Sequence, residues 1–266
     1  MHLIIGTGNV GLPLSRLFHT SNIPALSTSR AGNAASDIIQ SIFMTPPPSI
    51  DMVQAMKPFI DFAAKEKGVK RFVLLSSSLV PPLGGIVHGA VHKYISELGV
   101  EYAAIRPSWF FQNFHPPAPG FVFYADPENG TVISSTGSGK VGFVDARDIA
   151  ESAFRAMTEK EPLNGSYIVF GPELLTYTDV AKILSSVTGR SITHRNLSRS
   201  EFEEHAKRVI PHTEAITTVE DMLRNGAEER LFLDGGAEDG KEKEVIWKGK
   251  RSFQIYAEEI KDVWMN

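Results

Sequence analysis

The chain has 266 residues, is 42% hydrophobic and carries a net charge of −4, so it can form a large core and has no electrostatic basis for binding nucleic acid. It contains no cysteine, which excludes disulfides, thiol catalysis and cysteine-ligated metals, and a cytoplasmic location is expected. No apolar run approaches the length of a membrane span, and no signal-like segment or membrane partner is expected.

The N-terminal stretch predicts a dinucleotide-binding turn. A short apolar run is followed by Gly6, Gly8 and Gly11, the pattern G-x-G-x-x-G, at the point where a strand leads into an amphipathic helix. The first glycine permits a tight turn, the second lets the backbone approach a pyrophosphate, and the third lets the helix pack on the strand. Free N–H groups of the first helical turn would face the phosphates, although a plain tight turn is the alternative. The residues assigned to this turn are Gly6, Thr7, Gly8, Asn9, Val10 and Gly11.

The second predicted strand, 23–30, ends without the acidic residue that would bind the ribose hydroxyls of NAD. Ser29 and Arg30 stand there instead, and the next acidic residue is Asp37. Hydroxyls and a guanidinium suit a 2′-phosphate, so NADPH is favoured over NADH. The alternative is that Arg30 is only a solvated loop charge.

The segment 31–39 is too short for the helix, strand and helix that a usual Rossmann unit places before the next strand, 40–44. We therefore expect the edge strand and its helix to be missing, which would leave the adenine side of the site more exposed. Thr45 and Pro46 follow strand 40–44 and would border the ligand crevice. A helix is expected over 51–67, kinked or split by Pro58.

The next strand, 69–75, ends in a serine-rich exit that includes Ser76 and Ser77, and the strand 102–107 ends in Pro107. Between them lies a predicted helix, 89–98, on which an ordinary short-chain dehydrogenase would carry Tyr-x-x-x-Lys to supply a proton. That motif is absent here. Reduction of a carbonyl needs an acid, whereas an iminium needs only hydride, so the chain is better suited to iminium reduction or to no chemistry.

His92 lies on the same predicted helix and is a candidate for both cofactor binding and catalysis. It could anchor the nicotinamide ribose or act as a weak proton relay, and a surface or core histidine is an equal alternative. Ser76 is the second catalytic candidate. The predicted cofactor-binding set beyond the glycine turn is Ser29, Arg30, Thr45, Pro46, Ser76, Ser77, His92 and Pro107.

An aromatic stretch follows the strand at 102–107. Its rings could be core packing, or they could form a pocket wall that stacks on a flat or cationic ligand, and we favour the wall. The predicted substrate-binding residues are Trp109, Phe110, Asn113, Phe114 and Phe143. The remaining histidines show no metal-ligand pairing, so no metal is expected.

The alternation of strands and helices predicts an α/β fold, a Rossmann-like doubly wound parallel sheet. We expect an NADP-binding domain over 1–150 and a smaller α+β substrate region over 151–266 that completes the same globule. The other predicted elements are a loop over 115–139 with one or two short strands, strands at 141–144, 167–170 and 192–195, helices at 145–157, 176–187 and 252–264, a helical stretch over 198–225 interrupted by Pro211, and a loop over 234–244.

Several stretches resemble the fungal festuclavine/agroclavine dehydrogenases, which are NmrA-like atypical short-chain dehydrogenases. They are 69–78 (VKRFVLLSSS), 91–94, Arg106 to Phe110, Asn113-Phe114 and 171–177 (GPELLTY). The resemblance implies NADPH-dependent reduction of an iminium formed from a tricyclic ergoline aldehyde, giving a clavine alkaloid. This chain departs from the family in the glycine turn, in the region after Arg30 and in the loop 81–86. A non-catalytic NADP-binding regulator, or a reductase of a different cyclic imine or carbonyl, is the alternative.

Overall fold

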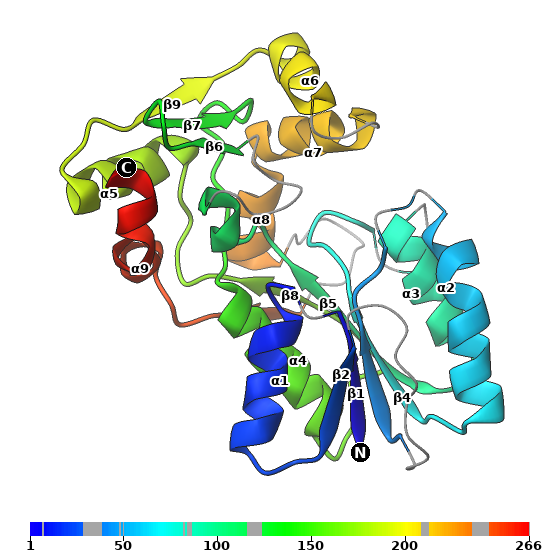
Figure 1. Ribbon diagram of the computed structural model, residues 1–266. Helices are drawn as coiled ribbons and strands as arrows, with labels where there is room; N and C mark the ends of the chain where they lie inside the picture. The colour runs from blue at the N-terminus through cyan, green and yellow to red at the C-terminus, as the bar shows by residue number, and fades with distance from the viewer. Residues whose placement is uncertain are drawn as a thin grey trace. The chain divides into compact units, whose positions relative to one another are not determined.

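The chain divides into two compact units, each with its own core. The first comprises residues 1–107 and 146–169, and the second comprises 108–145 and 170–266. The computed structural model (Figure 1) describes residues 1–6, 8–28, 39–47, 49, 51–81, 83, 87–115, 124–208, 213–235 and 245–265. These units are each made of two separate stretches, and the predicted division at residue 150 stays a prediction.

The first unit is built on a parallel sheet. Its strands follow the order β8-β5-β4-β3-β1-β2, and every neighbouring pair is parallel. They are β1 (His2–Ile5), β2 (Ala25–Thr28), β3 (Ser41–Met44), β4 (Arg71–Leu75), β5 (Glu101–Pro107) and β8 (Gly165–Phe170). Strands β3 and β4 are almost wholly buried, as expected of parallel strands covered on both faces. Strand β2 is the outermost described strand on this side of the sheet, and the predicted loss of an edge strand stays a prediction, because residues 29–38 lie outside the described residues.

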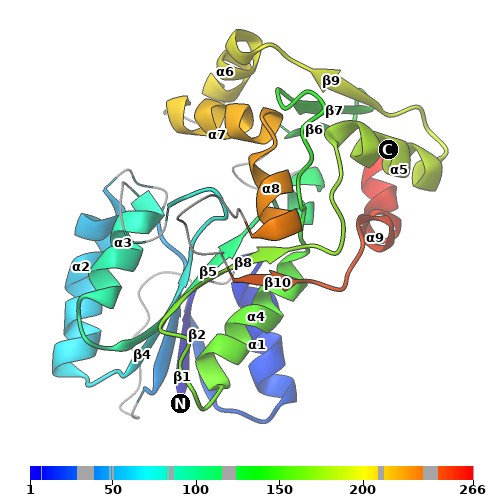
Figure 2. The ribbon, with the colours of Figure 1, turned by 180° about the vertical axis from the view of Figure 1, so that it is seen from behind.

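Helices cover both faces of this sheet, which makes it doubly wound as predicted. Helices α1 (Gly11–Thr20) and α4 (Ala146–Thr158) pack together on one face, and α2 (Met52–Asp61) and α3 (Val87–Ser96) on the other (Figures 1 and 2). On the α2–α3 side, apolar residues such as Met56, Ile60 and Val91 pack against Ile42 and Phe72 of the sheet. The predicted Rossmann-like fold is therefore confirmed.

The helix predicted over 51–67 is interrupted, although not at Pro58. Asp51 caps α2 by accepting a hydrogen bond from the backbone N–H of Gln54 at 3.1 Å. Pro58 lies inside α2, and the helix widens into a π-helical turn, η1 (Phe62–Glu66), just beyond it. The widening follows the proline by a single turn, and the backbone N–H of Lys67 closes it by donating to the carbonyl oxygen of Phe62 at 3.1 Å.

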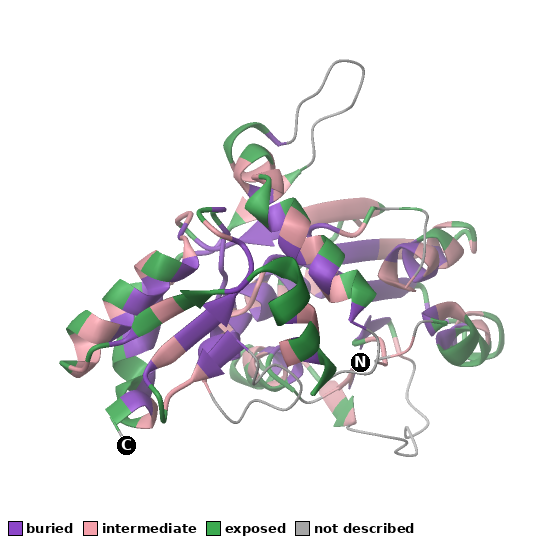
Figure 3. Ribbon diagram, turned by 90° about the horizontal axis from the view of Figure 1, so that it is seen from above, coloured by how far each residue is buried: buried purple, intermediate pink, exposed green. Residues whose placement is uncertain are grey.

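The second unit combines helices with a small sheet, whereas the α+β region predicted over 151–266 stays a prediction, because two strands of this sheet precede residue 151. Strand β6 (Ala125–Asp126) pairs antiparallel with β7 (Thr131–Ser134), and β7 pairs parallel with β9 (Thr193–Asn196). The helical elements are η2 (Phe111–Phe114), α5 (Tyr177–Thr188), α6 (Arg199–Lys207), α7 (Glu214–Arg224), α8 (Ala227–Asp234) and α9 (Phe253–Met265). Capping boxes begin α5 and α6, which explains why both helix starts were predictable. Buried and exposed positions alternate around the helices (Figure 3).

Helix α8, the short strand β10 (Ile246–Lys248) and the 3-10 turn η2 of this unit were not predicted. The C-terminal helix α9, which was predicted, holds η2 in place. The indole Nε1 of Trp264 donates to the carbonyl oxygen of Phe114 at 2.9 Å, and Phe253 packs edge-on against Phe111 and Phe114. No helix in the described part of the chain is long and apolar enough to cross a membrane.

Candidate functional site

The carboxyl ends of four strands meet along one edge of the sheet in the first unit. Register pairs Ile5 with Met44 and Leu75 with Ile105, so the residues that follow these strands are neighbours. The N–H of Thr45 donates to the carbonyl oxygen of Ile5 at 3.2 Å. In a doubly wound sheet, ligands bind in the crevice outside this edge. The structure thus brings together Gly6, Thr45, Ser76 and Pro107, all predicted to bind the cofactor.

The glycine turn can be tested for its fit to a pyrophosphate by asking why each position is glycine. Gly6 has a φ of +101°, which other residues rarely adopt, and a Cβ at Gly11 would overlap with the carbonyl oxygen of Gly6. The protein itself therefore requires glycine at both positions. At Gly8 φ is not in the left-handed region, and a Cβ would have no described atom within 4 Å. The described residues therefore do not require glycine at position 8, as expected where a ligand approaches the backbone.

Helix α1 begins directly after this turn. Val10 is buried, Asn9 is exposed, and the N–H of Leu12 donates back to the carbonyl oxygen of Gly8 at 3.1 Å. Pro13 falls in the first helical turn, where its missing N–H costs nothing. The first turn holds no acidic side chain, so the positive end of the helix dipole is not neutralised locally. Three predicted cofactor residues, Thr7, Ser29 and Arg30, lie outside the described residues.

The serine-rich exit of β4 is held in place by a buried arginine. Backbone N–H groups of Ser76 and Ser78 donate to the carbonyl oxygens of Ile105 and Pro107, at 2.6 and 3.0 Å. From below, the Arg106 guanidinium donates to the carbonyl oxygens of Ser77, Ser78 and Val80 at 3.4, 2.8 and 3.1 Å. Sequence reasoning used Arg106 only as part of a resemblance and missed this role. These hydrogen bonds hold the turn at the ligand edge.

His92 is buried on α3, and its ring contacts the ring of Tyr102 at a centroid distance of 5.4 Å. Tyr102 is near the start of β5, whereas the predicted nicotinamide site is at the carboxyl end of the strands. The roles predicted for His92 in cofactor binding and catalysis thus gain no support from this contact and stay predictions.

His88, which the sequence analysis did not select, lies one helical turn before His92 on α3. Burial lowers the pKa of His88 to about 4, so the ring is neutral at pH 7. Its Nδ1 is buried and has no hydrogen-bond partner within the described residues. The i, i+4 spacing of the two histidines was the available signal, because that spacing places both on one face of a helix.

The predicted substrate-binding residues lie in the second unit, and they separate into two groups. Trp109 and Phe110 are partly exposed, whereas Asn113, Phe114 and Phe143 are buried. The Phe114 ring packs edge-on against Phe143 and Tyr177 at centroid distances of 5.3 and 5.8 Å. Core packing thus accounts for Phe114 and Phe143, while Trp109 and Phe110 fit the predicted wall better. Substrate binding by all five stays a prediction.

Two buried carboxylates in the second unit were missed by sequence reasoning. Glu220 on α7 accepts hydrogen bonds from the N–H and hydroxyl of Ser135 at 2.6 and 3.1 Å and from the hydroxyl of Tyr124 at 3.2 Å. Glu228 on α8 accepts from the Ser108 hydroxyl at 2.6 Å and the Gly142 N–H at 3.1 Å. Burial raises the pKa of Glu220 to about 7, despite these bonds and the nearby Arg224.

The raised pKa of Glu220 predicts that the free energy of unfolding falls as the pH rises from about 4.5 to about 7. The usual carboxyl pKa is 4.5, so the folded protein holds a proton on Glu220 more tightly than the unfolded chain does. The resulting contribution is intact below pH 4.5 and is lost as pH rises through 7, by about 3 kcal/mol in all. The free energies of unfolding of the wild type and Glu220→Gln are measured in urea at pH 5 and pH 8. We expect the variant to be more stable relative to the wild type at pH 8 than at pH 5. The same difference in unfolding free energy at both pH values would contradict the raised pKa of Glu220.

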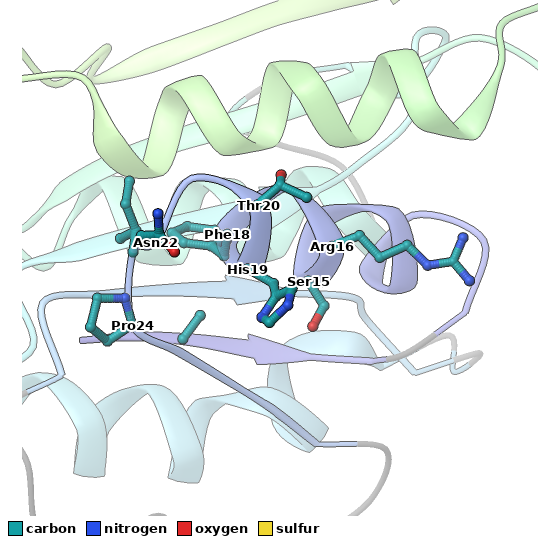
Figure 4. A pocket seen from close by; sticks show the side chains of 9 residues that line it. Ser15, Arg16, Phe18, His19, Thr20, Asn22 and Pro24 are labelled. Carbon is teal, nitrogen blue, oxygen red and sulfur yellow. The ribbon is translucent and has the colours of Figure 1, made fainter.

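A groove of about 700 Å³ lies beside α1, in the first unit. Figure 4 shows its lining, which includes Ser15, Arg16, His19 and Asn22. These residues belong to the outer face of α1 and to the segment that leads into β2, away from the carboxyl ends of the strands. The groove is thus separate from the predicted cofactor edge. Among the residues that the structure describes, no three His, Asp or Glu side chains are grouped to hold a metal ion.

Comparisons with known sequences identify relatives over most of the chain. The sequence profile of the NmrA-like family matches residues 35–229. Festuclavine synthase I of Penicillium roqueforti is 36% identical, with 85% of this chain and 77% of that protein aligned. Agroclavine dehydrogenase of Claviceps purpurea is 31% identical, with 97% of this chain and 96% of that protein aligned.

Comparisons with solved structures support the fold. The Citrobacter sp. triphenylmethane reductase, solved with NADP(H), aligns with a TM-score of 0.61 at 18% identity, over 85% of this chain and 90% of that one. The NADPH-dependent quinone oxidoreductase of Escherichia coli, solved with NADPH, aligns with a TM-score of 0.59 at 20% identity, over 85% and 87%. At these identities the likeness is one of fold alone.

Proposed function

Because this chain belongs to the NmrA-like family, as its predicted resemblance indicated, we propose that it is an NADPH-dependent oxidoreductase that reduces a cyclic iminium. The proposed substrate is a tricyclic ergoline-type intermediate, and the product is a clavine alkaloid. The names of its relatives, festuclavine synthase and agroclavine dehydrogenase, support this substrate class. The cytoplasm is the proposed location.

The observation that carries the proposal is the glycine turn. Gly6 and Gly11 are glycines for reasons of fold, whereas nothing described requires glycine at Gly8. A turn of this kind, at the start of α1, fits the pyrophosphate of a dinucleotide. Residues 6–11 would hold the phosphates, and Thr45, Ser76 and Ser77 would border the remainder of the cofactor. Arg30, outside the described residues, is proposed to bind the 2′-phosphate.

Bound NADPH would supply hydride to the iminium carbon, and the π electrons of the C=N bond would pass to nitrogen. The product is then a neutral amine and the cofactor is oxidised to NADP⁺, so the electrons and charges balance without a proton. This chemistry suits a helix α3 that reads HGAVHKY, without the Tyr-x-x-x-Lys acid. The protein's contribution is to hold the cofactor at the sheet edge, where Arg106 fixes the serine-rich turn.

The proposal is tested with purified protein in two separate measurements. The first is binding of NADPH and NADH, followed by cofactor fluorescence, with tighter binding of NADPH expected. The second is the loss of NADPH absorbance on adding a stable cyclic iminium, compared with a ketone of the same ring size. Turnover of the iminium alone would support the proposal. Preferred turnover of the ketone would replace it with carbonyl reduction, and tight binding without turnover would favour a non-catalytic regulator.

A further inference from the structure

A buried carboxylate on α8 ties the predicted aromatic wall to a second segment of the chain. Glu228 is fully buried, and its Oε2 accepts a hydrogen bond from the Ser108 hydroxyl at 2.6 Å and another from the Gly142 N–H at 3.1 Å. Ser108 directly precedes Trp109 and Phe110, the two partly exposed residues of that wall. One oxygen atom on α8 therefore holds residues from two distant parts of the sequence.

The two segments also bond directly to each other. The N–H of Val144 donates to the carbonyl oxygen of Trp109 at 2.9 Å, and the N–H of Phe111 donates to the carbonyl oxygen of Val144 at 2.9 Å. Gly142 is held from its other side as well, since its carbonyl oxygen accepts from the N–H of Gly171 at 3.1 Å. The backbone of Trp109 is therefore held by hydrogen bonds on both sides of the residue.

The negative charge of Glu228 also reaches the aromatic residues beside this wall. The pKa of Tyr177 is raised well above its usual value, chiefly by burial and further by charged neighbours, Glu220 and Glu228 among them. Tyr177 stacks on Tyr124 at a centroid distance of 5.7 Å, and Tyr124 meets the Trp109 indole edge-on at 6.4 Å. A charge in the interior is screened little by solvent, so its effect extends to such neighbours.

An aromatic face and a nearby carboxylate both favour a positively charged ring. The face of an indole attracts cations through its quadrupole, and a negative charge close by adds to this attraction. A neutral flat ring gains only the stacking. Taking a carboxylate out of water costs free energy, and an apolar side chain at position 228 would serve the packing of α8 without that cost. The carboxylate is therefore suited to recognition of a cation.

We propose that Glu228 is a positioning residue of the substrate site, which orients Trp109 through Ser108 and gives the site its preference for a cationic ring over a neutral one. The inference rests on the proposed function for the identity of the ligand, an iminium, and it extends that function by naming what recognises the charge. Hydride transfer removes that charge, so the carboxylate stabilises the bound substrate more than the transition state. Its effect is on binding and not on the chemical step.

The test compares two flat three-ring probes, N-methylacridinium, which carries a permanent positive charge, and acridine, which is neutral at pH 8. Binding to the intact protein is followed by probe fluorescence at pH 8 with NADP⁺ present, since the oxidised cofactor gives no hydride to the cation. We expect the wild type to prefer the cation. Glu228→Gln should reduce that preference about fivefold or more, because glutamine keeps an acceptor oxygen and loses the charge. An unchanged preference in this variant would overturn the proposal.

Glu229→Gln is the matched control for the loss of a charge. Glu229 follows Glu228 on α8, but its side chain is 35% exposed and paired with Lys140 at 3.1 Å, so water screens its charge. This variant should keep both the wild-type preference and the wild-type melting temperature. If Glu229→Gln loses the preference as far as Glu228→Gln does, net charge is responsible and the proposal fails.

Ser108→Ala tests the positioning role without removing a charge. Losing the hydroxyl that bonds to Glu228 should loosen Trp109, so both probes should bind about three- to tenfold more weakly. Ser152→Ala is the matched control, since Ser108 and Ser152 are each 1% exposed and the Ser152 hydroxyl donates to the carbonyl oxygen of Ile149 at 2.7 Å. That control should bind both probes normally. Wild-type affinity for both probes in Ser108→Ala would overturn the proposal, even where Glu228→Gln is too unstable to purify.

The same variants keep this inference distinct from the proposed function. NADPH affinity should be unchanged in Glu228→Gln, because Glu228 lies outside the unit that carries the glycine turn. If the preference for the cation depends on Glu228 but no iminium is reduced, the cation site stands and the proposed reaction fails. If an iminium is reduced, Glu228→Gln should raise its KM without lowering kcat. An unchanged KM would leave the reaction standing and remove the role of Glu228.

Discussion

Replacing Gly8 by alanine is expected to leave the fold intact and to weaken NADPH binding by about tenfold or more, whereas Gly11→Ala is expected to damage the fold itself. A Cβ at Gly8 meets no described atom within 4 Å, and under the proposed function it would stand where the pyrophosphate approaches. A Cβ at Gly11 would overlap with the backbone oxygen of Gly6, and backbone cannot move aside as a flexible side chain can. The cost at Gly11 is at the upper end for overpacking, about 3 kcal/mol.

The two glycine variants are compared by thermal melting and by cofactor fluorescence. Gly8→Ala should have the melting temperature of the wild type and should not bind NADPH at concentrations that saturate the wild type. Gly11→Ala should have a lower melting temperature or express poorly. Normal NADPH affinity in Gly8→Ala would remove the phosphate role from this turn, and the plain tight turn would be the better interpretation.

Trp264→Ala is expected to destabilise the second unit by about 3–5 kcal/mol, the range for truncating a large buried aromatic side chain. Trp264 is fully buried on α9, and its Nε1 donates to the carbonyl oxygen of Phe114 at 2.9 Å. The variant therefore loses packing and also leaves the Phe114 carbonyl without this donor. Because Phe114 ends η2, the aromatic stretch that begins at Trp109 should loosen as well.

Urea unfolding followed by circular dichroism measures this effect, with Met265→Ala as the control. Met265 is adjacent on α9 but 45% exposed, so its truncation should change stability little. The unfolding midpoint of Trp264→Phe should lie between those of Trp264→Ala and Met265→Ala, since this variant keeps an apolar ring and loses the hydrogen bond. Equal unfolding midpoints for Trp264→Ala and Met265→Ala would show that the C-terminal helix does not support the second unit.

The elements that were predictable have local signals. The strands β3 and β4 are short apolar runs because both of their faces are covered. The capping boxes at Thr176 and Ser198 mark the first residues of α5 and α6. Helix α8 has no such signal. Its buried residue is Glu228, which bonds to Ser108 and Gly142 far away in the sequence, so no apolar periodicity marks the helix.

The candidate site shows the same limit. Gly6, Thr45 and Ser76 could be placed together from the sequence, because parallel strands bring their carboxyl ends to one edge. The roles of His92 stay predictions, because the spacing of His88 and His92 along α3 does not show which of the two rings faces the sheet edge. The Arg106 contacts beneath the serine-rich turn also depend on the backbone path of a loop, so no local pattern reveals them.

The sequence by itself was sufficient for the doubly wound sheet, the glycine turn, the absence of a Tyr-x-x-x-Lys acid and the resemblance to the NmrA-like family. These follow from residue type and from spacing along the chain, which need no knowledge of distant contacts. Only the tertiary structure decided that no described residue approaches a Cβ at Gly8, that Glu220 is buried against Ser135, and that Trp264 donates to the carbonyl oxygen of Phe114. Each of these depends on which distant residues fill the space around one atom, and periodicity indicates a buried face without naming what covers it.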